Sequence, residues 1–234
     1  MTYRKGITAI MEEVRILDLK ESILADNDAD AEKLRGELAD EKTVYINVMS
    51  SPGSGKTSTI LRLLEQLKLS FRVGVLEADI DGDVDTRTML SAGVPAVQLH
   101  TGGMCHLDAD MSRQALREIG SKDLDIVILE NVGNLVCPAE FDTGAQINLV
   151  ILSVPEGDDK PLKYPLMFSK ADVVVVNKMD AMEAFDFSPE RFKMYVAERC
   201  PDAPVFMVSA ATGEGIVALS EWVGSRANEL LAAE

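Results

Sequence analysis

The sequence predicts an α/β fold in which a mainly parallel sheet is flanked by helices. Short runs of Val, Ile and Leu alternate along the chain with segments of helical periodicity. Several runs are apolar at every position, which is typical of strands covered by helices on both faces. A glycine-rich loop joins the first run to the first helical segment, as in phosphate-binding proteins. The expected strands span residues 44–49, 73–77, 96–99, 125–130, 147–154, 172–177 and 205–209. The expected helices span residues 57–69, 108–119, 161–168, 189–199 and 216–231.

The length of the chain indicates one main domain. Its 234 residues, 47% of them hydrophobic, suffice for one sizeable core, which we expect at residues 44–234. Residues 1–43 are charged and are expected to form a helical extension that packs on this domain or on a partner. We expect helices at 7–24 and 29–38 and no strand in this extension.

Composition excludes several classes of function. A net charge of −16 argues against binding to nucleic acid or to anionic membranes. The apolar runs are too short to span a bilayer, and the first residues lack a secretory signal pattern. Three cysteines do not suggest a disulfide framework. We therefore expect a cytoplasmic protein that binds neither nucleic acid nor membrane.

A phosphate-binding loop, SSPGSGKT, begins at Ser50. Its glycines allow backbone N–H groups to turn toward phosphates, Lys56 is expected to reach the β and γ oxygens, and Thr57 is expected to bind Mg²⁺. The N-terminus of the following helix adds a positive dipole end. Ser50 stands where a first glycine is usual. The residues expected to bind the nucleotide phosphates are Gly53, Ser54, Gly55, Lys56, Thr57 and Ser58, with Lys56 also catalytic.

A second nucleotide motif, NKMD, ends the expected strand at 172–177 and comprises Asn177, Lys178 and Asp180 around one variable position. The Asp180 carboxylate is suited to accept hydrogen bonds from guanine N1–H and from the exocyclic amine, a donor pair that adenine lacks. The Lys178 stem is expected to lie along the base. Ser209 and Ala210 follow another strand, where a backbone N–H is expected to meet guanine O6. The sequence therefore predicts guanine nucleotides.

Carboxylates for a catalytic metal follow two of the expected strands, in the segments EADID and ENVG. ENVG has the form of the Asp-x-x-Gly switch of GTPases, with Glu130 in place of Asp. We expect Thr57 to bind Mg²⁺ directly, with Asp79 and Glu130 beside it or joined through water. The Gly133 N–H is expected to contact the γ-phosphate, and Asp79 or Asp81 to orient the attacking water.

The acidic run continues with Asp83 and Asp85. A calcium loop is excluded, because the twelfth position from either candidate start is Thr88 or Leu90 rather than the bidentate Glu. Asp83 and Asp85 are therefore expected to form a solvated acidic turn.

A second metal site is suggested by the adjacent Cys105 and His106 and by Cys137. Thiolate and imidazole ligands suit Zn²⁺ or Ni²⁺, and three of them leave a four-coordinate site open to water or a second subunit. Such residues are more often packing, but Cys137 lies four residues after Gly133. If GTP hydrolysis releases that loop, a metal ligand must move with it. Nucleotide state would then set the metal affinity.

Together these motifs resemble the HypB family, GTPase accessory proteins that help to insert nickel into [NiFe]-hydrogenase. The resemblance runs from about residue 44 to the C-terminus and includes SSPGSGKT, EADI, CH, ENVGNLVCP, EGDDKPLKYP, NKMD and SA. It implies a P-loop NTPase fold of the SIMIBI class, which includes the signal-recognition and urease-accessory GTPases. It also implies a homodimer that forms with bound nucleotide and a GTPase domain at 44–234.

The resemblance further implies that Cys105, His106 and Cys137 form a nickel or zinc site at the dimer interface. A lysine of EGDDKPLKYP, Lys160 rather than Lys163, is expected to reach the partner's nucleotide. The implied partners are a second nickel-insertion accessory protein and the hydrogenase large-subunit precursor. Residues 1–43 contain no Cys or His, so we expect neither the tight N-terminal nickel site nor the histidine-rich store of some members. His100 and Cys200 are expected not to bind metal.

The sequence thus predicts a GTP-hydrolysing metallochaperone with slow turnover, since nothing resembles an arginine finger. A urease-type nickel GTPase is less favoured, because its compact Cys-Pro-His is absent where Cys137-Pro138 runs into Ala139. A chaperone GTPase for another cofactor, such as cobalamin, would not need the cysteines. A metal carrier with a vestigial nucleotide site would not need an intact phosphate loop, and a small-molecule kinase would not need NKMD.

Overall fold

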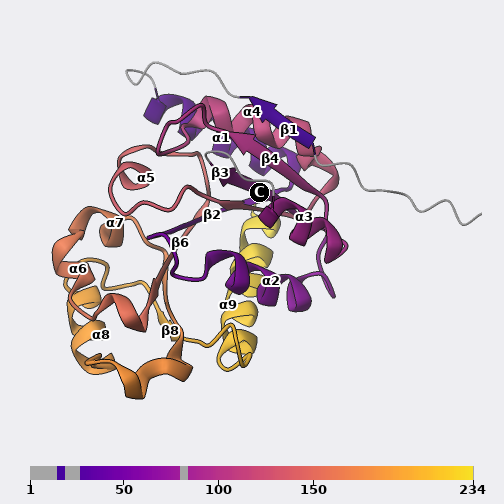
Figure 1. Ribbon diagram of the computed structural model, residues 1–234. Coiled ribbons are helices and arrows are strands. Elements are labelled where there is room, and N and C mark those ends of the chain that lie inside the picture. The colour runs from indigo at the N-terminus through magenta and orange to yellow at the C-terminus, as the bar shows by residue number, and fades with distance from the viewer. Residues whose placement is uncertain (1–14, 19–26, 80–83, 234) are drawn as a thin grey trace, which may run out of the picture.

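The computed structural model describes residues 15–18, 27–79 and 84–233, whose strands form one sheet of eight parallel strands (Figure 1). The strand order is β1-β4-β3-β5-β2-β6-β7-β8. The strands are β1 (Arg15–Asp18), β2 (Val44–Ser50), β3 (Val73–Asp79), β4 (Ala96–His100), β5 (Ile126–Glu130), β6 (Ile147–Ser153), β7 (Val173–Asn177) and β8 (Val205–Met207). The seven strands expected from the sequence are all present. Their carboxyl ends meet at one edge of the sheet, where the loops that carry the nucleotide motifs begin.

Helices cover both faces of this sheet (Figure 1). The α-helices are α1 (Asn27–Glu41), α2 (Lys56–Leu67), α3 (Val84–Ser91), α4 (Ala109–Ile119), α5 (Cys137–Glu140), α6 (Lys160–Lys163), α7 (Pro165–Ser169), α8 (Pro189–Ala197) and α9 (Ile216–Ala232). One buried cluster joins α2, α3 and α9 to the sheet, a second joins α1 and α4, and a third joins α7 and α8. In β2, Ile46 belongs to the first cluster and the adjacent Tyr45 to the second, so the central strand is covered on both faces.

The N-terminal segment differs from the prediction. The expected helix at 29–38 is confirmed as α1, which packs against α4. The expectation of no strand in residues 1–43 is wrong, because Arg15–Asp18 forms β1 and pairs in parallel with β4. The remaining residues of the expected helix at 7–24 lie outside the described residues. A four-residue strand is too short to show periodicity, and its pairing with the edge of β4 is a tertiary effect.

Two further differences concern helices. The helix expected at 161–168 is divided into α6 and α7 at Tyr164, because Pro165 has no N–H to continue the helical ladder. Helix α3 was not expected, since its sequence carries a weak apolar pattern. No helix in the described ranges is both long and apolar enough to cross a membrane.

Candidate functional site

The phosphate-binding loop connects β2 to α2 and is held against the NKMD motif. Gly53 and Gly55 adopt positive φ angles of 75° and 93°, which favour glycine. A Cβ atom on Gly55 would lie 2.4 Å from Asn177 Nδ2. That same amide donates a hydrogen bond to the Ser54 carbonyl oxygen at 3.0 Å. The glycine is therefore required both by the turn and by the close approach of the second motif.

Ser50 organises the inside of the loop. Lys56 Nζ donates to Ser50 Oγ at 3.0 Å, and Ser54 Oγ donates to the same oxygen at 2.7 Å. Ser50 Oγ donates in turn to the Ser51 carbonyl at 2.7 Å. Ser50, the residue that departs from the usual glycine, thus holds the Lys56 ammonium group within the loop through a hydrogen bond.

The base-recognition motifs lie side by side at the ends of β7 and β8. Ser209 Oγ donates to Asp180 Oδ1 at 2.5 Å, which fixes the carboxylate that is expected to read guanine. Lys178 has φ 63° and donates from Nζ to the Gly53 carbonyl at 2.6 Å. The Ala210 N–H, expected to meet guanine O6, is directed at Asn177 Oδ1 at 3.0 Å. Both motifs are therefore tied to each other and to the phosphate-binding loop.

Three carboxylates meet beside the phosphate-binding loop. Oxygen atoms of Glu77, Asp85 and Glu130 lie within 4.8 Å of one another, the one such group of potential metal ligands in the described part of the chain. Glu77 and Glu130 are paired in register on β3 and β5. Thr57 Oγ1 donates to Glu130 Oε1 at 2.9 Å, which joins the group to the start of α2. With Lys56, these carboxylates line a cavity of about 260 Å³.

The electrostatics of this group favour a cation. Burial and the neighbouring Glu130 raise the pKa of Glu77 well above its usual range, and burial also raises the pKa of Glu130. The Lys56 ammonium group opposes both shifts. Glu77 Oε1 and Glu130 Oε2 are buried without a hydrogen-bond partner. Hard oxygen donors that lack partners fit Mg²⁺.

The residues expected to bind magnesium overlap with this carboxylate group only in part. Glu130 belongs to the group, and Thr57 is hydrogen-bonded to it. Asp79 is the last residue of β3, but its side chain lies outside the description, as does the whole of Asp81. The expectation that Asp85 belongs to a solvated turn is wrong. It occupies the first turn of α3 and faces Glu77, because the buried Thr86 side chain is hydrogen-bonded to the buried Gln98 of β4.

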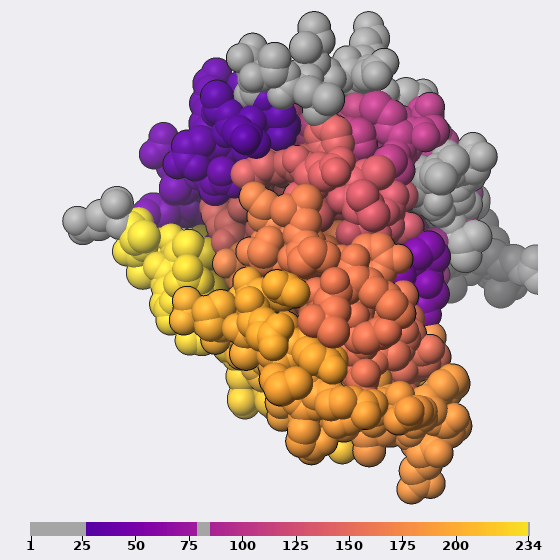
Figure 2. Space-filling view, turned by 90° about the vertical axis from the view of Figure 1, so that its left-hand side faces the viewer, coloured from indigo at the N-terminus to yellow at the C-terminus, as the bar shows by residue number. Residues whose placement is uncertain are grey.

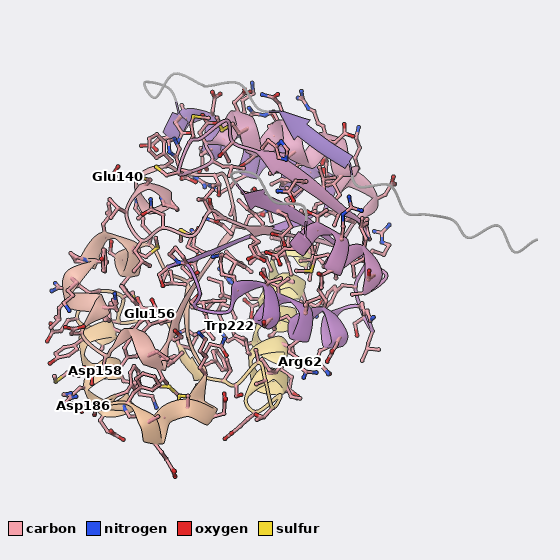
Figure 3. All side chains as sticks on the ribbon, viewed as in Figure 1. Arg62, Glu140, Glu156, Asp158, Asp186 and Trp222 are labelled. Carbon is pink, nitrogen blue, oxygen red and sulfur yellow. The ribbon has the colours of Figure 1, made fainter. Side chains whose placement is uncertain are left out.

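The loop after β5 links this site to the predicted metal ligands. We call residues 131–140 the switch loop; it runs from the end of β5 through Gly133 to the end of α5. A Cβ atom on Gly133 would lie 3.2 Å from Pro52 of the phosphate-binding loop. Cys137 is the first residue of α5, whose last residue, Glu140, projects outward (Figure 3). A single short loop therefore carries both the contact with the phosphate-binding loop and a candidate thiolate ligand.

The structure brings two of the three predicted ligands together. A hydrogen bond with Cys105, with burial, raises the pKa of the Cys137 thiol. Cys105 Sγ lies 3.9 Å from His106 Nδ1, and the His106 ring stacks on Phe141 with 3.4 Å between ring centroids. Burial lowers the pKa of His106, which favours the neutral imidazole that ligates metals. The three donor atoms do not all lie within 4.8 Å of one another.

Cys105 lies before α4 rather than within it. Helix α4 begins at Ala109, and its N-cap is Asp108, whose carboxylate accepts a hydrogen bond from the Met111 N–H at 2.9 Å. Cys105 lies in the loop between β4 and this cap. The position that begins a helix is that of Cys137.

The two lysines of the EGDDKPLKYP segment differ in their contacts. Lys163 Nζ lies 2.5 Å from Asp159 Oδ2, whereas Lys160 Nζ lies 5.3 Å from the centre of the Tyr164 ring. In the same segment, Glu156 accepts from the Ser153 N–H at 2.7 Å and is hydrogen-bonded to Ser51 of the phosphate-binding loop (Figure 3).

Comparison with known proteins agrees with this geometry. The model of the CobW/HypB/UreG nucleotide-binding domain matches residues 44–207. The chain is 42% identical over 213 residues to "Hydrogenase maturation factor HypB" of Azotobacter vinelandii, which covers 91% of this chain and 69% of that protein. The chain belongs to the HypB family. It is also 42% identical over 211 residues to "Hydrogenase/urease maturation factor HypB" of Helicobacter hepaticus, covering 88% of this chain and 86% of that protein.

Solved structures support the assignment to the HypB family. HypB from Helicobacter pylori, in a crystal structure in complex with nickel, superposes with a TM-score of 0.82 at 37% identity and covers 89% of this chain and 98% of that chain. HypB from Archaeoglobus fulgidus gives a TM-score of 0.81 at 35% identity over 87% of this chain and 100% of that chain. The receptor FtsY from Elizabethkingia anophelis, at 20% identity and a TM-score of 0.51, shares the fold, covering 79% of this chain and 67% of that chain. The predicted P-loop fold of the SIMIBI class is confirmed.

Sequence reasoning did not single out Glu77, and it placed Asp85 in a turn rather than beside Glu77 and Glu130. Glu77 lies within an apolar strand, and its register partner is Glu130. A charged residue inside a strand buried on both faces was the available signal. Cys200, expected not to bind metal, is buried, and its Sγ lies 3.6 Å from the Val196 carbonyl. His100 ends β4 opposite Asp79.

Proposed function

We propose that this protein is a GTP-hydrolysing metallochaperone that couples its nucleotide state to the delivery of nickel during [NiFe]-hydrogenase maturation. The observation that carries the proposal is the switch loop. Gly133 packs on Pro52 of the phosphate-binding loop, and four residues later Cys137 begins α5 beside Cys105. Family membership and the nickel-bound relative support the same function.

In the nucleotide half, GTP is the substrate. The backbone of Gly53 to Gly55, the Lys56 ammonium group and the exposed Ser58 at the start of α2 would hold the phosphates, while Asp180 would accept from guanine N1–H and the exocyclic amine. Lys178 would lie along the base, and the Asn177, Ser209 and Ala210 cluster would position Asp180. For the Ala210 N–H to donate to guanine O6, it must give up its hydrogen bond with Asn177 Oδ1.

Magnesium would be held by Thr57 and Glu130, with Glu77 and Asp85 beside them. When bound, it supplies charge neutralisation for the phosphate oxygens. Asp79 is proposed as a further ligand, and Asp79 or Asp81 as the residue that orients the attacking water. The Gly133 N–H is proposed to donate to the γ-phosphate and to lose that partner after hydrolysis. Turnover is expected to be slow, since nothing in the sequence resembles an arginine finger aimed at the γ-phosphate.

In the metal half, nickel or zinc is the cargo, and Cys105, His106 and Cys137 are its ligands. Thiolate and imidazole donors suit both ions. Since the three donor atoms do not converge in one chain, we propose that a nucleotide-dependent homodimer completes the site. Lys160, rather than Lys163, would reach the partner's nucleotide, since Lys163 is paired with Asp159.

Hydrolysis would release Gly133 and move Cys137, so that nickel passes to an acceptor. The acceptors proposed are a second nickel-insertion accessory protein and the hydrogenase large-subunit precursor, in the cytoplasm. We further propose that residues 1–43 act as an extension of the GTPase domain at 44–234.

A nickel titration tests the proposal. Wild type and Cys137→Ala are titrated with nickel in GDP and in a non-hydrolysable GTP analogue, while absorbance is followed in the thiolate-to-metal charge-transfer region. We expect nickel affinity in the wild type to depend on the nucleotide and the variant to lose that dependence, with its GTP turnover retained. Nickel binding that is absent or indifferent to nucleotide in the wild type would leave a GTPase with another cargo. Measured turnover near zero would instead favour a simple metal carrier.

A further inference from the structure

Three asparagine side chains form a hydrogen-bond chain behind the switch loop. Asn131 Nδ2 donates to Asn47 Oδ1 at 3.0 Å, and Asn47 Nδ2 donates to Asn148 Oδ1 at 3.1 Å. They project from the end of β5 and from the adjacent strands β2 and β6. Asn131 is 0% and Asn47 2% exposed. Buried amides are retained at a cost unless each is satisfied, so a continuous chain of them among Val, Ile and Leu strands calls for a reason.

The direction of this chain is fixed by the backbone. The Val132 N–H donates to Asn131 Oδ1 at 2.8 Å, and a backbone N–H can only donate. Asn131 must therefore present its NH₂ group to Asn47, which must present its own NH₂ group to Asn148. Reversing any one amide would break hydrogen bonds along the chain.

The asparagine hydrogen-bond chain lies near both ends of the switch loop. It begins at Asn131, the first residue of the loop, whose N–H also donates to the Val48 carbonyl at 3.0 Å. It ends at Asn148, which lines a cavity of about 320 Å³ together with Pro138 and Ala139 of α5. The cavity leaves space beneath the helix that carries Cys137, while the chain holds the root of the loop in place.

Because Asn131 and Val132, the first residues of the switch loop, are held in place, a movement of Gly133 affects the rest of the loop differently. If Asn131 and Val132 were free to shift, a displacement of Gly133 by the γ-phosphate would be absorbed at the root. Because hydrogen bonds through Asn47 and Asn148 tie these residues to β2 and β6, the displacement of Gly133 is instead transmitted toward the C-terminal end of the switch loop, to Cys137 and α5. Coupling between two sites of this kind requires an element with two arrangements that both ligands bias.

We propose that Asn47, Asn131 and Asn148 are positioning residues that make the nickel affinity at Cys137 depend on the nucleotide. This inference rests on the proposed function. In this inference the asparagine chain determines how strongly the nucleotide site and the nickel site are coupled. It does not set the affinity of either site for its ligand.

Substitutions at Asn148 test it, because this residue is only partly buried and is neither a proposed nucleotide-binding residue nor a proposed nickel ligand. Asn148→Leu removes the acceptor for Asn47 Nδ2, whereas Asn148→Asp keeps an acceptor at the same position. Nickel dissociation constants of wild type and both variants are measured in GDP and in a non-hydrolysable GTP analogue, together with the GDP affinity. Asn148→Ala is measured in parallel and decides by the same criteria if the leucine variant does not bind GDP.

In the wild type we expect the two nickel dissociation constants to differ by about 5- to 150-fold, the usual range of allosteric coupling. In Asn148→Leu the ratio should fall to within about twofold of one, with nickel affinity in GDP and GDP affinity within roughly threefold of wild type. Asn148→Asp should keep the wild-type ratio. A variant that is merely destabilised would lose both affinities together.

Two outcomes overturn the inference separately from the proposed function. A wild-type ratio well above one that persists in Asn148→Leu and Asn148→Ala overturns the inference and leaves the proposed function standing. A wild-type ratio of one overturns the proposed function, and with it the coupling that the chain is proposed to transmit.

Discussion

The nucleotide side and the cysteine side of this molecule are built in different ways. On the nucleotide side, the phosphate-binding loop, the NKMD motif and Glu130 lie at the carboxyl ends of the parallel strands β2, β7 and β5, and direct hydrogen bonds join them. On the cysteine side, two thiols meet, but the neighbouring imidazole is stacked on Phe141 and the three donor atoms do not converge. Figure 2 shows α1 bordering the segment that follows α5, where Arg35 makes two hydrogen bonds with Asp142 at 2.9 and 3.0 Å.

This difference between the two sides indicates which of them can be rearranged by a ligand at low energetic cost. Strand ends in a buried sheet are held by the core, so the nucleotide side is preorganised before any ligand binds. The switch loop and α5 have no such support from strands along their length and lie over a cavity of about 320 Å³. Three residues of this loop, Val132, Leu135 and Ala139, belong to the buried clusters, so a ligand that reorganises the cysteine side has fewer core contacts to disrupt than one that moves a strand.

Lys56→Ala tests the nucleotide side and has the largest expected effect. Among the residues that the structure describes, the Lys56 side chain makes one hydrogen bond, to Ser50 Oγ, so the fold should be retained. Loss of a cation aimed at the transferring phosphate should lower the rate of GTP hydrolysis by about 100- to 1,000-fold. The measurement is phosphate release under single-turnover conditions, with circular dichroism to verify the fold.

Lys122→Ala, in a turn remote from the phosphate-binding loop, is the matched control and should hydrolyse GTP at the wild-type rate. Equal rates in Lys56→Ala and wild type would show that this loop does not hold the γ-phosphate.

Asp180→Asn tests base recognition and should have an intermediate effect. The substitution keeps an oxygen to accept from Ser209 Oγ but removes the charged acceptor for guanine N1–H and the exocyclic amine. Weakening two charge-assisted hydrogen bonds should reduce GDP affinity on the order of 100-fold. Affinity for xanthosine diphosphate should rise, because its C2 oxygen accepts from the new amide. The two affinities can be compared by calorimetry, and an unchanged preference for GDP would exclude Asp180 as the base-reading residue.

Much of the fold could be predicted because the strands are buried on both faces and therefore appear as apolar runs. The phosphate-binding loop and NKMD were also predictable, since their chemistry depends on residues adjacent in sequence. The placement of Glu77 beside Glu130 was not, because it depends on the register between β3 and β5. The strand β1 escaped prediction because four residues show no periodicity and its pairing with β4 is a tertiary contact. The break between α6 and α7 follows from Pro165, which the sequence does show.

The cysteine side was only half predictable. The pairing of Cys105 with Cys137 follows from two loops that leave β4 and β5, the strands on either side of β3, and the sequence indicated both loops. The stacking of His106 on Phe141 involves residues 35 positions apart, and no pattern in either segment indicates it. Tertiary contacts of this kind decide whether a ligand set converges.

Phe141→Ala sharpens the comparison through the smallest expected effect. If His106 must leave Phe141 to bind nickel, then the stacking energy opposes metal binding in each chain. Aromatic pairs contribute about 0.5–1.5 kcal/mol beyond area burial, which corresponds to roughly 2- to 12-fold in affinity. Phe141→Ala should therefore bind nickel more tightly by about that factor in GDP, as followed by charge-transfer absorbance.

Phe185→Ala is the matched control, because Phe185 is an exposed aromatic residue that follows NKMD rather than α5. It should leave nickel affinity unchanged. Weaker nickel binding in Phe141→Ala alone would mean that the stacked ring is already in its ligating orientation. The cysteine side would then be preorganised like the nucleotide side, and what it lacks would be the ligands of a second chain rather than a movement of its own.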